Sequence, residues 1–287
     1  MADELEKRTS TELYWVEREP WLKSHGYKLR PRYSPDWVPS WKADPTKYDN
    51  CVFQEDAHVA SRISVGLDAT RISDGLQVYI KRVVKDSDEQ RIIEYFMDAA
   101  VAQTAHRYVV SFLEILDNVP NDAKYVLVVM PLLQEIRIPR FDTIGECIDC
   151  VEQLLEAVQF LHHHNIAHRD CQQNNIRMEG HGIFPHGFHP QYNYRNVEYT
   201  GDAVAHYTRT QRPPRYLLID FGISIRYPAS EKEPRALPWR GGDRTVPEFQ
   251  NPATFHYPYN PFPTDVYYIG NAIRQIFMEE VRLSIYH

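Results

Sequence analysis

The spacing of apolar residues changes several times along the chain, and each change predicts a different kind of element. Within residues 57–84, β-branched and apolar residues dominate after the turn-like Ser73-Asp74-Gly75. This pattern predicts strands in that stretch. Two further runs, 109–116 and 125–129, flank the turn-like 118–122 and predict two more strands.

Helical spacing appears in four other places. Ser10 or Thr11 can cap a helix through residue 18, and Pro20 fits the first turn of a second helix that Gly26 ends. Asp86 or Ser87 can cap a helix over 88–100. A longer helix begins after Thr143, and its apolar residues predict a stripe that faces the core, namely Ile144, Cys147, Ile148, Val151, Leu154, Leu155, Val158 and Leu161.

Prolines recur within residues 30–41 and exclude a regular helix or central strand there. Tyr33, Trp37 and Trp41 lie in this stretch, and we expect them to dock on the core because exposed aromatic area is costly. The alternative is an arm that binds a partner. Residues 1–56 are therefore interpreted as an N-terminal extension that packs on the folded core.

Composition narrows the classes of function. The net charge of −7 gives no support to binding of nucleic acid or of an anionic membrane surface. No apolar run is long enough to span a bilayer, and the N-terminus lacks the order of a signal peptide. Four cysteines are too few for a disulfide scaffold, so an intracellular location, cytoplasmic or nuclear, is expected.

Two short motifs carry the candidate chemistry. The first is His168-Arg169-Asp170, followed by Asn175, and the second is Asp220-Phe221-Gly222 at the end of an apolar run. Together they resemble the signature of eukaryotic protein kinases, and Val78-Tyr79-Ile80-Lys81 is similar to that family's Val-Ala-Ile-Lys strand. Val246-Pro247-Glu248 and the 265–270 stretch beginning with Asp265 resemble two further family motifs, in the family's order.

The resemblance implies an α+β, bilobal protein-kinase-like fold. Its small lobe would be a mainly antiparallel sheet over 57–132, and its mainly helical large lobe would occupy 133–287. That lobe would carry an insertion at 179–214 and would be truncated after the family's F helix.

The resemblance also assigns roles to residues, with ATP and Mg²⁺ as cofactors and a protein as substrate. Lys81 would hold the ATP phosphates, paired with Glu89; Glu94 is the less suitable alternative acid. Met130 and Leu132 would lie at the interlobe hinge, against the adenine.

In the large lobe, Asp170 would orient the substrate hydroxyl and accept its proton, while Asn175 and Asp220 would hold Mg²⁺. Structural or regulatory roles would fall to a second set of residues: His168, Arg169, Phe221, Gly222, Glu248 and Asp265. Asp265 would brace the backbone of the catalytic loop. Arg169 could receive a phosphate carried by Ser224, Ser230 or Thr245.

Several positions depart from the family pattern. No Gly-x-Gly-x-x-Gly precedes Lys81, Tyr79 replaces a small residue of the adenine pocket, and Arg177 replaces an apolar one. Gln172 replaces the lysine of the catalytic loop, so a charge is lost where phosphoryl transfer would occur. Two hypotheses stay open: an active Ser/Thr-type protein kinase, or a pseudokinase or truncated kinase-like domain that acts as a binding or scaffold module.

More narrowly, several stretches resemble kinase-like proteins common in mushroom-forming fungi, among them 67–71, 167–171 and 187–190. The insertion is rich in histidine, but its His181, His186, His189 and His206 lack the spacing of a zinc site, so a surface loop is expected. Cys147 and Cys150 have no second ligand pair, which argues against a metal or redox role.

Overall fold

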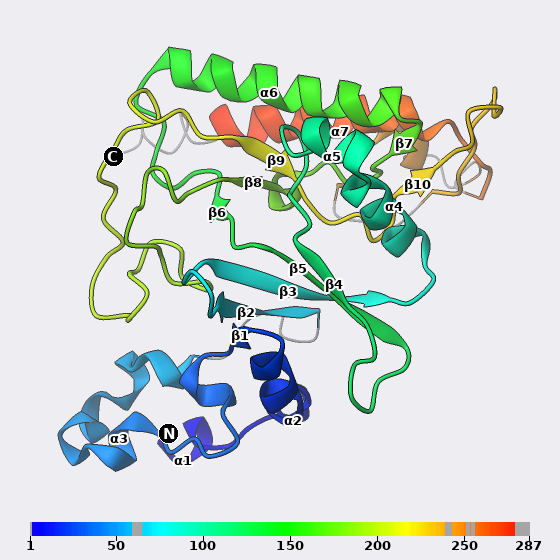
Figure 1. The fold of residues 1–287 in the computed structure, drawn as a ribbon. Coiled ribbons are helices and arrows are strands. Elements are labelled where there is room, and N and C mark those ends of the chain that lie inside the picture. The colour runs from blue at the N-terminus through cyan, green and yellow to red at the C-terminus, as the bar shows by residue number, and fades with distance from the viewer. Residues whose placement is uncertain (1, 59–64, 239–242, 251–252, 254–255, 279–287) are drawn as a thin grey trace. The chain divides into compact units, whose positions relative to one another are not determined.

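The computed structural model is an α+β structure and describes residues 2–58, 65–238, 243–250, 253 and 256–278. It divides into two compact units, neither of which is a continuous stretch (Figure 1). Unit 1 comprises residues 1–85, 112–132 and 184–206, and unit 2 comprises 86–111, 133–183 and 207–287. The predicted small lobe, 57–132, is thus shared between the units, and part of the predicted insertion belongs to unit 1.

A five-stranded antiparallel sheet forms the centre of unit 1, in the order β1-β2-β3-β5-β4. The strands are β1 (Tyr27–Lys28), β2 (Gly66–Arg71), β3 (Gln77–Val84), β4 (Glu114–Leu116) and β5 (Tyr125–Pro131). The predicted turn joins β2 to β3: Gly75 has a φ of 76°, and Asp74 accepts a hydrogen bond from the amide of Leu76 at 3.2 Å. Predicted strand residues 59–64 lie outside the described part of the chain.

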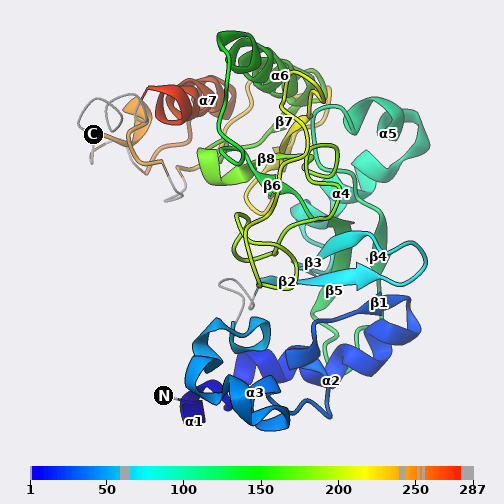
Figure 2. The same ribbon diagram turned by 90° about the vertical axis from the view of Figure 1, so that its left-hand side faces the viewer.

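The N-terminal segment covers one face of this sheet. Val78 and Ile80 of β3 share a face with residues of β2 and β5, and they pack into one cluster with Trp15 and Leu22 of helix α2 (Ser10–Ser24). Figure 2 shows α1 (Ala2–Leu5), α2 and α3 (Ser40–Ala43) on one side of the sheet. Burying each large apolar side chain contributes about 1.5–3 kcal/mol, so this segment is part of the core of unit 1.

Helix α2 corrects the prediction of two helices around Pro20. It begins with a capping box between Thr9 and Glu12 and continues through Pro20 to Ser24. The buried positions Trp15, Arg18 and Leu22 form a stripe on both sides of the proline. Packing of this stripe offsets the roughly 3 kcal/mol that an interior proline costs.

The aromatic residues of the proline-rich stretch are placed in two groups. Tyr33 is fully buried in the main cluster of unit 1, as expected for docking on the core. Trp41 is also buried, but it forms a separate small cluster with Cys51 and Ala57, against which Trp37 packs. Short helical turns replace regular elements here, including η1 (Pro31–Tyr33), η2 (Pro45–Phe53) and η3 (Glu55–Ala57).

Unit 2 combines helices with two small sheets. Helices α6 (Ile144–His163) and α7 (Pro261–Phe277) pack side by side (Figures 1 and 2). The sheets are β6-β8-β9, made of Gln134–Glu135, Ile176–Met178 and Tyr216–Leu218, and β7-β10, made of Ile166–Ala167 and Ile225–Arg226. The predicted 88–100 helix ends earlier, since α4 (Asp88–Met97) stops where Asp98 caps the separate helix α5 (Ala99–Ala105).

Two predictions in this unit need correction. The predicted strand 109–116 divides: Val109 makes a parallel bridge to Leu218 in unit 2, whereas only Glu114–Leu116 joins the sheet of unit 1. On α6 the buried positions include Cys150, Leu154, Ala157, Val158 and Leu161. Ile144, Ile148 and Leu155 are exposed by 79%, 53% and 49%, because the predicted stripe merged two faces of the helix.

Candidate functional site

The site in unit 2 is built on one buried carboxylate of helix α7. Asp265 is fully buried and accepts hydrogen bonds from the backbone amides of His168 at 2.8 Å and Arg169 at 2.6 Å. Nε2 of His162 on α6 lies 3.1 Å from the same carboxylate. Since charge-assisted hydrogen bonds to a buried carboxylate are strong, Asp265 fixes the start of the loop that carries Asp170.

His168 fixes the loop from within. Its Nδ1 accepts a hydrogen bond from the amide of Asp170 at 3.3 Å, and its Nε2 lies 3.1 Å from the carbonyl oxygen of Ile219. These partners assign the proton to Nε2, which donates to that carbonyl. The imidazole therefore ties the loop to the residue before Asp220.

Asn175 brings the two motifs together. Its side-chain Nδ2 donates to the backbone oxygen of Asp170 at 2.9 Å and to Oδ2 of Asp170 at 2.7 Å. Its own carbonyl oxygen accepts a hydrogen bond from the amide of Ile219 at 3.0 Å. The pairing of β8 with β9 thus places Asn175 beside the residue that precedes Asp220.

Asp220 lies two residues after β9 in a strained backbone conformation, with a φ of 67°. A left-handed conformation is uncommon for a residue other than glycine and is retained at functional turns when neighbours hold it. One carboxylate oxygen of Asp220 accepts a hydrogen bond from the amide of Gly222 at 3.2 Å. A side chain at Gly222 would also approach Glu89, whose Oε2 lies 3.6 Å from the position that a Cβ would occupy.

Phe221 and Arg169 hold the segment that follows Asp220. The Phe221 ring packs between Phe96 of α4 and His168, with centroid distances of 5.2 and 5.1 Å. The Arg169 guanidinium donates to the carbonyls of Ile223 at 3.0 Å and Leu237 at 2.7 Å. Arg169 is only 8% exposed, so it clamps this segment from the interior.

Four other predicted structural or regulatory positions lie outside these contacts or are engaged in their own. Ser224 is buried and its hydroxyl donates to the carbonyl of His168 at 2.9 Å, so this candidate phosphate acceptor is engaged, whereas Ser230 and Thr245 are exposed. Glu248 lies half-buried in η5 (Pro247–Phe249). No ion pair of Glu248 is found within the described residues.

The remaining predicted residues belong to unit 1. Lys81 is 9% exposed on β3, and Met130 lies at the end of β5, opposite Tyr79. The amide of Leu132 donates to the carbonyl of Gln77 at 2.9 Å, so it is engaged within the unit. The Tyr79 ring covers Gly66, where a Cβ would lie 2.7 Å from the ring atoms.

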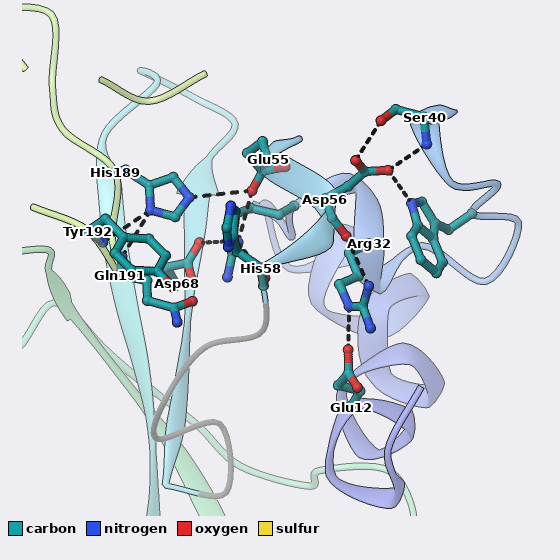
Figure 3. Close-up of polar contacts among 12 residues, drawn as sticks. Glu12, Arg32, Ser40, Glu55, Asp56, His58, Asp68, His189, Gln191 and Tyr192 are labelled. Atoms are coloured by element: carbon teal, nitrogen blue, oxygen red, sulfur yellow. Dashed lines mark hydrogen bonds and ion pairs between the residues drawn. The ribbon is translucent and has the colours of Figure 1, made fainter. Parts of the chain in front are cut away.

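Unit 1 also contains a polar cluster that no sequence motif predicts, which we call the Arg30 cluster: Arg30, Glu55, His58, Asp68 and His189. The Arg30 guanidinium contacts Asp68 and Glu55, each at 2.8 Å. Nε2 of His189 lies 3.7 Å from Glu55, and Figure 3 shows the two side chains pointing toward one another. His189 is fully buried, which corrects its assignment to a surface loop. Its Nδ1 accepts hydrogen bonds from the amides of Gln191 and Tyr192, so it is not protonated there.

Near this cluster, three more charged residues hold the N-terminal segment together (Figure 3). Arg32 pairs with buried Glu12 at 2.5 Å and donates to the carbonyl of Asp56 at 2.9 Å. The Asp56 carboxylate accepts hydrogen bonds from the hydroxyl of Ser40 at 2.7 Å and its amide at 2.8 Å. No local sequence signal identifies these partners, because they are distant along the chain.

Several other types of site find no support. The described residues contain no group of three or more His, Cys, Asp and Glu side chains that could hold a metal ion. Burial raises the pKa of both Cys147 and Cys150, which opposes formation of reactive thiolates. No helix within the described part of the chain has the length and apolar character needed to cross a bilayer.

Comparison of the chain with models of known protein families and with curated proteins finds no match.

Proposed function

We propose that the chain is an ATP- and Mg²⁺-dependent protein kinase that transfers a phosphoryl group to Ser or Thr hydroxyls of a protein substrate. The observation that carries the proposal is the double role of Asn175. Its side chain bonds to Asp170 at 2.7 Å, while its backbone bonds to the residue before Asp220 at 3.0 Å. Three residues suited to phosphoryl transfer thereby meet within one unit.

Asp170 is suited to the role of base. Its Oδ1 is buried and has no hydrogen-bond partner within the described residues. In the proposed reaction this oxygen accepts the proton of the substrate hydroxyl. The hydroxyl oxygen forms a bond to the γ-phosphorus of ATP, the bond from that phosphorus to the bridging oxygen breaks, and ADP leaves.

The residues present fit a magnesium ion. A carbonyl oxygen can only accept hydrogen bonds, so the contact with the Asp170 backbone oxygen identifies the donor atom as Nδ2 of Asn175. Its Oδ1 is then left without a hydrogen bond from the described residues. This amide oxygen and the Asp220 carboxylate are the hard ligands that would hold Mg²⁺. Bound there, the ion would neutralise charge on the phosphates.

A thermal-shift titration with ATP and Mg²⁺ tests nucleotide binding. We expect the wild-type chain to gain several degrees and the Lys81→Met and Asp220→Asn variants to lose that gain. Lys28→Met, at an exposed position of the same sheet, is the matched control and should behave as wild type. Absence of a shift in the wild type, or equal shifts in all variants, contradicts the proposal.

Transfer itself is measured with labelled ATP and a casein-type or basic protein substrate. We expect incorporation into Ser or Thr that Asp170→Asn abolishes, because the base is removed while the side-chain shape is kept.

A second function, a binding module without transfer, is favoured by two observations in unit 1. The Tyr79 ring occupies space above Gly66, and the amide of Leu132 already donates to Gln77. The first leaves less space for an adenine ring against the sheet, and the second leaves one hydrogen-bond donor fewer at the predicted hinge. Binding of ATP without transfer, or no binding at all, is the outcome that supports this alternative.

A further inference from the structure

Gln172 contacts Asp170 directly. It lies two positions after Asp170 and is half-buried. Its Nε2 donates to Oδ2 of Asp170 at 3.2 Å, and its backbone amide donates to the carbonyl of Asp170 at 2.8 Å. Its own carbonyl accepts a hydrogen bond from the amide of Asn175 at 2.9 Å. The backbone of Gln172 therefore bonds to both Asp170 and Asn175, and its side chain reaches the Asp170 carboxylate.

The two oxygens of Asp170 have opposite environments. Oδ2 accepts hydrogen bonds from two side-chain amides, that of Gln172 at 3.2 Å and that of Asn175 at 2.7 Å. Oδ1 is buried and receives none from the described residues. Rotation of the carboxylate would exchange the oxygens only by breaking both hydrogen bonds. The pair of amides consequently selects Oδ1 as the oxygen left to accept a proton.

We propose that Gln172 is a positioning residue, which fixes the Asp170 carboxylate so that Oδ1 faces the substrate hydroxyl. The inference rests on the proposed function and adds to it. Gln172 replaces a lysine expected from the kinase resemblance, and it can supply the hydrogen bond to Asp170 without supplying the charge. Loss of Gln172 should thus affect the orientation of the base more than the binding of nucleotide.

Steady-state kinetics separate these effects. Gln172→Ala removes the donor and should lower kcat about tenfold, as expected for one hydrogen bond to an ionised group. Gln172→Glu should lower kcat further, because a second carboxylate then lies beside Asp170. The KM for ATP should change by less than about twofold in both variants, because the lost contact does not involve the nucleotide.

Gln172→Lys restores a donor and is the rescue variant, with kcat equal to or above the wild-type value. Gln159→Glu makes the same change of charge as Gln172→Glu at an exposed position of α6 and should leave kcat unchanged. Thermal melting of every variant shows whether a lost rate reflects lost folding.

A second measurement does not depend on activity. In a ¹⁵N correlation spectrum the side-chain amide of Gln172, assigned by its loss in Gln172→Glu, should move strongly in Asp170→Ala. The side-chain amide of Gln159 should stay in place. If the wild type transfers no phosphate, the proposed function fails, and the amide signal alone decides whether Gln172 holds Asp170. An unmoved Gln172 signal, or unchanged kcat in folded Gln172→Ala, overturns the inference.

Discussion

Buried carboxylates organise both units, but they are neutralised in different ways. In the Arg30 cluster of unit 1, Glu55 and Asp68 each lie 2.8 Å from the Arg30 guanidinium. In unit 2, Asp265 contacts two backbone amides and His162, while Asp170 keeps one buried oxygen without a partner in the described part of the chain. A carboxylate whose oxygens are hydrogen-bonded or ion-paired stabilises the fold. A carboxylate with an oxygen that has no partner can still accept a proton in a reaction.

The largest expected effect comes from Arg30→Met. This change leaves Glu55 and Asp68 without their shared cation, and breaking such a largely buried pair costs about 3–5 kcal/mol. Urea denaturation measures the loss. The control is Arg71→Met, because Arg71 pairs with the exposed Asp74 and the loss of a surface pair should cost far less stability. Equal losses would remove the distinction between buried and surface pairs in unit 1.

Asp265→Asn should cost about 2 kcal/mol in the free energy of unfolding. The amide can still accept one backbone hydrogen bond, but its nitrogen cannot accept the other, and the charge is lost. Urea denaturation checks stability, and hydrogen exchange at the amides of His168 and Arg169 should rise. Unchanged exchange at both amides would show that Asp265 does not hold the loop.

Acid should weaken the Arg30 cluster. Burial alone would raise the pKa of Glu55, but His189 and the Arg30 guanidinium hold that pKa below its ordinary value of 4.5. Because the folded-state pKa is lowered, the contribution of Glu55 is present above pH 4.5 and is lost as pH falls through the lower value. The stability difference between wild type and Glu55→Gln should shrink below about pH 4.5. A constant difference down to pH 3 contradicts this.

Asp170→Asn should change stability least, by less than about 1 kcal/mol. Its remaining oxygen can accept the amides of Gln172 and Asn175, and the replaced oxygen had no partner to lose. Calorimetry and the transfer assay on the same sample test this contrast. A large loss of stability would mean that Asp170 is structural, like Asp265.

Local signals predicted much of the fold. The Ser73-Asp74-Gly75 turn, the strands on either side of it and the Thr143 helix start follow from residues within a few positions of one another. The sequence also singled out Asp170, Asn175, Asp220 and Asp265. The structure places these four in unit 2, joined through backbone and side-chain contacts.

Features that depend on contacts between residues far apart in the chain could not be predicted. Pro20 was a local reason to end a helix, and the packing of Trp15 and Leu22 outweighed it. His189 looked like a loop residue because its contact with Glu55 joins segments far apart in the chain. The Gln172 contact could have been suspected, since a donor two positions after Asp170 lies within reach of it.

The discontinuity of the two units has a consequence for synthesis. Unit 1 takes β5 from residues 112–132, after one segment of unit 2, and His189 from residues 184–206, after a second segment of unit 2. A nascent chain on the ribosome therefore cannot finish its first unit before much of the second has emerged. Long-range closure of this kind slows folding, and incomplete intermediates expose apolar strands to aggregation. Expression at low temperature with chaperones should consequently raise the soluble yield more than cutting the chain at any of the boundaries between the units.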